Sequence, residues 1–142
     1  MHASRSHWHD YSCVAEHGIA AVSSTVPEPE GFALLRQAMF ADDYRGATVV
    51  FRGEFRVADA PRRAGLFLRV NTDPRRDITP LTEGAALADS DNTIVTIGAD
   101  RDWTRHEVTM RVPDDGDIVA FGIFLAGRGR IELRDAELVR ET

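Results

Sequence analysis

The segment VVFRGEFRV at positions 49–57 holds the residues whose types and spacing best suit a chemical site. Arg52, Glu54 and Arg56 alternate there with apolar residues, and a period of two predicts a β-strand that carries the three charges on one face. A carboxylate between guanidinium groups suits general acid–base chemistry, with arginine stabilising a developing negative charge. On a solvated face the same groups would form ion pairs that contribute about 0–1 kcal/mol each. The sequence leaves both interpretations open.

Turn signals recur at short and even intervals along the chain, at segments such as VPEPEG, DAPRR and PDDGD. They separate short segments rich in Val, Ile, Leu and Phe, a pattern typical of all-β sandwiches and barrels. The predicted strands are 18–25, 32–39, 48–58, 65–71, 93–97, 104–112, 118–126 and 130–139. Together they predict an antiparallel jelly-roll β-sandwich of eight or nine strands, with two sheets facing one core.

Two segments fit this pattern less well. Residues 32–44 have helix-like apolar spacing, so a helix competes with the strand, and a single helical turn is expected at 41–44. Residues 71–91 show no period and contain two prolines. A loop of that length is either a functional lid or a disordered segment.

Composition limits the classes of function. The 142 residues predict one domain spanning 1–142, with a frayed segment at 1–10, and 43% hydrophobic and 28% charged residues are ordinary for a globular chain. A net charge of −6 argues against a nucleic-acid partner. We find no apolar segment long enough for a membrane span and no leader, and a single cysteine, Cys13, fits a reducing compartment. We therefore expect a cytoplasmic protein, whose oligomeric state the sequence leaves unknown.

Metal and catalytic motifs are scarce. His7 and His9 could share a strand face and bind a metal, but no third ligand is evident, and a frayed terminus accounts for them better. His106 falls on an apolar row, where a packed histidine is expected rather than a catalytic one. Patterns such as GxSxG, Walker A, GxGxxG and HExxH do not occur, so no metal site is predicted and the common hydrolase and nucleotide-binding routes lack support.

A longer pattern resembles a known bacterial domain. The segments EPEGFALLRQAMFADDYRGATVVFRGEFRV, AGLFLRVNT, DWTRHEVTMRVPDD and IVAFGIFLAGRGRIELRDAEL follow its order and spacing from Glu28 to Leu138. This domain is common in actinomycetes and bacilli and is often fused to regulators. It resembles the galactose-binding-like jelly rolls, similar in architecture to family 6 and family 4 carbohydrate-binding modules. The resemblance implies a concave sheet that carries the ligand site.

Alternation then assigns residues to that site. The predicted site residues are Glu54, Arg52 and Arg69 as catalytic groups, and Phe67, Asn71, Phe124, Arg56, Asp91 and Asn92 as substrate-binding groups. Small residues at 120 and 122 would leave room above the sheet. The chain departs from the family where Glu54 replaces an aromatic residue and Phe67 replaces a tryptophan, so few rings remain to stack on sugars. No cofactor is expected, although Asp135 and Glu16 could hold a structural calcium ion of the kind many jelly rolls carry.

Three functions remain as hypotheses. The first is a cofactor-independent cyclase or dehydratase that acts on a small biosynthetic substrate such as a polyketide, because jelly rolls of this kind have been recruited for such chemistry. In that hypothesis Glu54 is the acid or base, Arg52 and Arg69 stabilise an oxyanion, and Phe67 and Phe124 form apolar walls. The second is a non-catalytic module that binds carbohydrate or another small molecule. The third is a protein-interaction domain.

Overall fold

The computed structural model describes residues 2–5, 9–71, 92–96 and 100–141. This part of the chain forms ten strands and no helix: β1 (His2–Arg5), β2 (Tyr11–Glu16), β3 (Ile19–Ser24), β4 (Phe32–Phe40), β5 (Thr48–Ala58), β6 (Arg63–Asn71), β7 (Asn92–Thr96), β8 (Arg101–Arg111), β9 (Ile118–Ala126) and β10 (Arg130–Glu141). Within it, no helix has the length and apolar character needed to cross a membrane.

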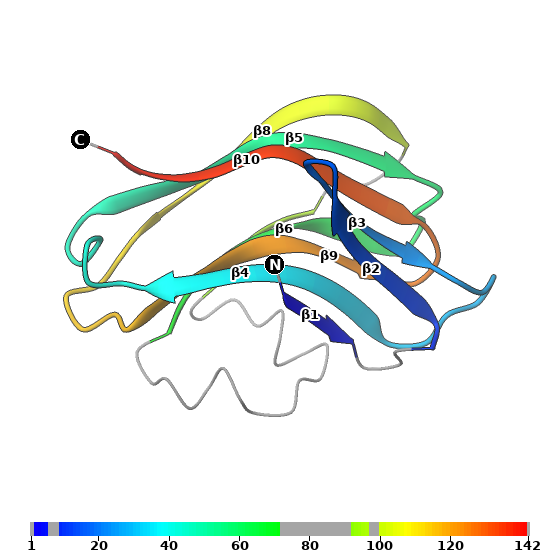
Figure 1. Ribbon diagram of the computed structural model, residues 1–142, viewed down its shortest axis with the longest axis horizontal. Coiled ribbons are helices and arrows are strands. Elements are labelled where there is room, and N and C mark those ends of the chain that lie inside the picture. Colours follow the sequence, from blue (N-terminus) through cyan, green and yellow to red (C-terminus); the bar gives the residue numbers. More distant parts are fainter. Residues whose placement is uncertain (1, 6–8, 72–91, 97–99, 142) are drawn as a thin grey trace.

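The strands form two five-stranded antiparallel sheets stacked as a sandwich (Figure 1). We call the sheet with order β1-β4-β9-β6-β7 sheet A, and the sheet with order β2-β3-β10-β5-β8 sheet B. Both sheets bow in the same direction, which places the outer face of sheet A on the inside of the curve (Figure 1). The jelly-roll β-sandwich predicted from the alternation is confirmed.

The predicted strands all form, with ends that shift by up to three residues, and the sequence missed two others. β2 pairs with β3, and β1 pairs with β4 through registers such as Ala3↔Leu35. The segment 1–10, predicted to be frayed, therefore includes a strand at His2–Arg5. The four residues HASR carry no apolar alternation, so only the pairing to β4 reveals this strand.

The segment 32–40 is a strand, and its helix-like spacing is overridden by pairing with β9 along its whole length. The single helical turn expected after it does form, because the amides of Tyr44 and Arg45 both donate to the carbonyl oxygen of Ala41, at 2.8 and 3.0 Å. The loop at 71–91, predicted to be a lid or disordered, and the predicted site residue Asp91 lie outside the described residues, except for Asn71.

The core lies between the sheets and is built from the inward rows of the strands. Phe51 of sheet B contacts Phe121 of sheet A at 4.9 Å between ring centroids, and both rings are buried. A second buried apolar cluster lies on the opposite, outer side of sheet A. It contains Phe32, Leu34, Phe67, Phe124 and Ala126.

A β-bulge in β10 explains the glycine in the middle of VVFRGEFRV. The register between β5 and β10 shifts between Arg134 and Glu137, so two residues of β10 lie opposite Gly53. A Cβ at Gly53 would lie 2.7 Å from Leu133 Cδ1 and 3.2 Å from the carbonyl oxygen of Arg134. Close approach of the bulged strand therefore favours glycine here.

Candidate functional site

Glu54 lies on the outer face of sheet B and is paired with Arg134 of β10. Nη2 and Nε of Arg134 donate to Oε2 of Glu54 at 2.8 and 3.1 Å. The prediction that Arg69 lies beside Glu54 is wrong, because β5 has β10 and β8 as neighbours, whereas β6 belongs to sheet A. The connection between β5 and β6 crosses from one sheet to the other, so alternation on the two strands refers to opposite faces of the sandwich.

The other charges of VVFRGEFRV also have partners on β10. Arg52 Nε donates to Glu137 Oε1 at 2.6 Å, and Arg56 makes two hydrogen bonds to the Glu132 carboxylate, at 2.9 and 3.1 Å. Each pair spans the directly opposed positions of β5 and β10. The charged row is thus one side of a cross-strand ladder, which fits the interpretation of an ion-pair network.

Trp103 of β8 belongs to the same outer face, a position that the sequence analysis did not predict. The guanidinium carbon of Arg134 lies 3.9 Å from the centroid of the indole ring, and that of Arg56 lies 4.7 Å from it. The register between β5 and β8 shifts near this point, between Phe55 and Val57. Two of the three arginines of the ladder, Arg56 and Arg134, are therefore also held by cation–π contacts.

Sheet A collects most of the remaining predicted residues. Phe67, Arg69 and Asn71 alternate along β6, and Phe124 lies on the neighbouring strand β9. The register pairs Arg69 with Asn92 of β7. These five predicted residues therefore lie on one sheet, whereas Arg52, Glu54 and Arg56, predicted for the same face, lie on the other. Asp91 is outside the described residues.

The rings of Phe67 and Phe124 are covered. They are 4% and 0% exposed, within the second apolar cluster, and the Arg63 guanidinium lies 5.5 Å from the Phe124 ring centroid. Neither ring presents a face for stacking in this structure. The apolar walls that the sequence assigned to a ligand are packing residues here.

Phe40 is an exposed aromatic residue on this face, with 79% of its surface accessible. It lies opposite Ile118, and the next row towards the centre of the sheet holds Ala38, Ala120 and Arg69. A hollow of about 190 Å³ is lined by Ala38, Met39, Phe40 and Ile118. Sequence reasoning ended the strand at position 39, and extending the even-numbered row from Phe32 by one more step would have found Phe40 on the outer face.

Arginine side chains flank small residues beside this hollow. Arg36 lies opposite Gly122 on β9, and Arg69 lies opposite Ala120. A Cβ at Gly122 would overlap with the Leu35 carbonyl oxygen, so the backbone of β4 itself requires glycine there. The small residues at positions 120 and 122 thus lie between two guanidinium-bearing positions, but both are buried, with Ala120 only 1% exposed. We call the group Arg36, Ala38, Phe40, Ile118, Ala120 and Arg69 the sheet A site.

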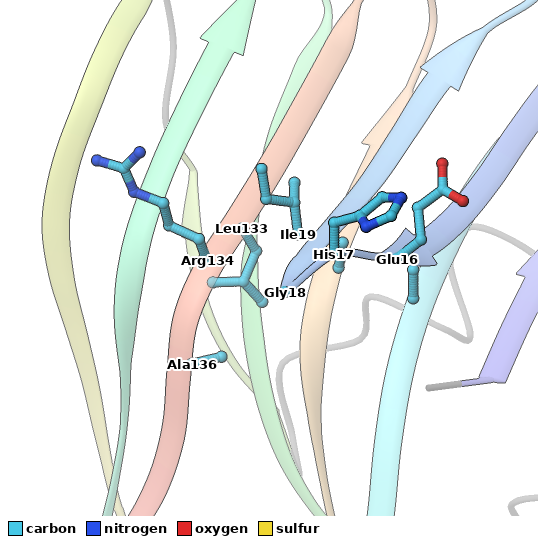
Figure 2. A pocket seen from close by; sticks show the side chains of 9 residues that line it. Glu16, His17, Gly18, Ile19, Leu133, Arg134 and Ala136 are labelled. Carbon is cyan, nitrogen blue, oxygen red and sulfur yellow. The ribbon is translucent and has the colours of Figure 1, made fainter.

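A pocket of about 450 Å³ opens in sheet B where β2 ends and β3 begins, beside the bulge of β10 (Figure 2). Its floor is apolar and includes Ala20 and Leu133. Figure 2 shows Glu16 and His17 on one side, while the Arg134 side chain extends away from them, towards β5. Because Arg134 is held by Glu54 and Trp103, it adds little polar character to this pocket.

Asp135 and Glu16, the residues considered for a structural calcium ion, have no third metal ligand nearby in the part of the chain that the structure describes. Asp135 is an exposed bulge residue with φ of 54°, and Glu16 lies at the end of β2. Among the described residues no three His, Cys, Asp or Glu side chains gather closely enough to hold a metal ion. His106 is half-buried, with its ring centroid 6.2 Å from that of Phe55, and His7 lies outside the described residues.

The fold defines the chain as a jelly-roll β-sandwich of the type found in carbohydrate-binding modules. A structure described as a family 4 module (CBM4) covers 98% of this chain and 78% of its own, at 22% identity and a TM-score of 0.58. A second, described as family 16 carbohydrate-binding module 2, covers 95% and 89% at 16% identity and a TM-score of 0.53. The enzymatically active domain of tailspike protein 4 of bacteriophage CBA120 contains a similar unit, at 11% identity and a TM-score of 0.67, over 99% of this chain and 19% of its own.

At these identities the likeness establishes the fold alone. No family model matches the sequence, and no curated protein does.

Proposed function

We propose that this chain is a non-catalytic module that binds a carbohydrate at the sheet A site. The exposed ring of Phe40 on the concave side of the sandwich is the observation that carries the proposal. An aromatic ring left open at the surface can stack on the apolar face of a sugar ring. Burying it fully would contribute about 1.5–3 kcal/mol.

The surroundings of Phe40 suit a sugar in two further respects. Ala38 is small and exposed beside the ring, and the arginine positions 36 and 69 bring guanidinium groups that can donate hydrogen bonds to sugar hydroxyl oxygens. Structural neighbours that are described as carbohydrate-binding modules support the same class of ligand.

The cyclase or dehydratase hypothesis is less well supported than this alternative. It required Glu54 and Arg69 on one face, and the sandwich separates them onto different sheets. Glu54 and Arg52 instead take part in the cross-strand ladder of sheet B. No comparison adds support for catalysis, and a binding module needs neither residue.

The test is a glycan microarray with the full chain, followed by titration calorimetry with each glycan that binds. The variant Phe40→Ala should weaken binding roughly 10- to 100-fold, which corresponds to the loss of about 1.5–3 kcal/mol. Val26→Ala is the matched control, because Val26 is 37% exposed in the loop before β4 and should leave affinity unchanged. Binding to no glycan, or equal affinity in Phe40→Ala, would contradict the proposal.

A further inference from the structure

A hollow on the outer face of sheet B lies on the opposite side of the molecule from Phe40. It has a volume of about 270 Å³ and is centred on Ala21, whose small side chain leaves a depression among larger neighbours. The register surrounds Ala21 with Ser23 and Ile19 along β3, Val14 across on β2 and Glu132 across on β10. We call this hollow the Ala21 pocket.

Polar groups converge on the Ala21 pocket from three strands. Ser12 and Ser23 lie directly opposite each other and place two hydroxyl groups at one end, beside Arg130. Glu16 of β2 lines the other end. Hydroxyl and carboxylate oxygens accept hydrogen bonds, while hydroxyl and guanidinium groups donate them, so the lining offers both kinds of partner.

Glu132 gives the pocket a fixed acceptor. Its side chain is only 10% exposed although it lies on an outward row of the sheet. Arg56 donates to both carboxylate oxygens, and Arg130 Nε lies 3.3 Å from Oε1. Burial of a carboxylate is costly unless it is paired, and this pairing holds the group in one orientation while it still lines the pocket.

The charges around the pocket nearly cancel. Glu16 and Glu132 line the pocket with two negative charges and Arg130 with one positive charge. Arg56, which does not line the pocket, pairs with Glu132 and offsets the second negative charge. Neither a strong cation nor a strong anion is therefore favoured. A volume just below the lower end of the range for drug-sized ligands, about 300 Å³, fits one small ring rather than a chain of rings.

We propose that the Ala21 pocket is a second binding site, for a single neutral polyhydroxylated ring such as a monosaccharide or the terminal residue of a glycan. It recognises hydroxyl groups through Ser12, Ser23, Glu16 and Glu132 rather than through an aromatic platform. The site shares no residue with the sheet A site, so it stands independently of the function proposed above.

The test uses amide-resolved NMR titration of the full chain with methyl glycosides of neutral hexoses, with glucuronate and glucosamine as charged counterparts. A neutral glycoside should shift the amides of Ser12, Ala21, Ser23 and Glu132. Ala21→Leu fills the hollow and should weaken this binding at least tenfold. Ala58→Leu is the matched control, because Ala58 lies on the same outer face in an exposed position outside the pocket.

Two further variants distinguish a loss of binding from a loss of folding, and the Ala21 pocket from the sheet A site. Ser23→Ala removes a lining hydroxyl without adding bulk, and should weaken binding even if Ala21→Leu fails to fold. Phe40→Ala should leave the shifts around Ala21 intact, which separates this site from the sheet A site. The absence of shifts around Ala21 with every neutral glycoside, a clear preference for either charged sugar, or unchanged affinity in both pocket variants would overturn the proposal.

Discussion

Arg134 donates two hydrogen bonds to Oε2 of Glu54, at 2.8 and 3.1 Å, and its guanidinium group stacks on Trp103. This pairing explains why a carboxylate stands between arginines in VVFRGEFRV. Glu54 faces a cation on the adjacent strand, and its own strand neighbours, Arg52 and Arg56, face glutamates on that strand. Each of these three charged residues of β5 therefore faces a residue of opposite charge on β10.

Removing this pair should change stability little. The side chains of Arg134 and Glu54 are 38% and 32% exposed, so water replaces much of what is lost. We expect Glu54→Gln to lower the free energy of unfolding by no more than about 1 kcal/mol. Urea denaturation measures this, and a double-mutant cycle with Arg134→Gln isolates the pair. A coupling energy of several kcal/mol would contradict the solvated-ladder interpretation.

Glu132 should be the most sensitive member of the ladder. It is buried and accepts hydrogen bonds from Arg56, and charged hydrogen bonds contribute about 1.5–3 kcal/mol. Glu132→Ala should therefore destabilise the protein more than Glu54→Ala in parallel urea denaturations. Equal effects would mean that burial of the carboxylate adds nothing to the interaction.

Tyr11 joins two turns at one end of the sandwich. Its hydroxyl group donates to the Gly31 carbonyl oxygen at 2.8 Å and accepts from the Gly127 amide at 2.9 Å, and the residue is 2% exposed. Tyr11→Phe leaves both backbone groups without this partner, which should cost about 1–3 kcal/mol. Thermal unfolding and urea denaturation measure the loss. Tyr44→Phe serves as the control, because Tyr44 is only partly buried.

Two glycines should tolerate alanine to different degrees. At Gly122 the new methyl group would collide with the backbone of Leu35, which cannot move without disturbing the pairing of β4 and β9. At Gly53 its closest neighbour is the end of the Leu133 side chain, which can turn away more easily. Gly53→Ala should cost about 1–3 kcal/mol, and Gly122→Ala should cost more or prevent folding. The reverse order in urea denaturation would show that the bulge, rather than β4, is the tighter contact.

The local pattern of the sequence determined eight of the ten strands in the described residues and the two faces of each. Alternation separated Phe51 from Arg52 and Leu68 from Arg69 correctly, because side chains on a strand point to opposite sides regardless of what lies beyond. The same pattern predicted the jelly-roll class, because short apolar rows separated by evenly spaced turns can be buried in few other folds.

Only the tertiary structure decided which rows share a face. β5 and β6 follow each other in the chain, yet they lie in different sheets, so Glu54 and Arg69 are separated by the core. Partner choice between strands depends on contacts between residues far apart in sequence, which no local period records. For the same reason, the sequence did not reveal that Phe67 and Phe124 are buried. It also did not reveal that Phe40, one position beyond the expected end of its strand, carries an exposed ring.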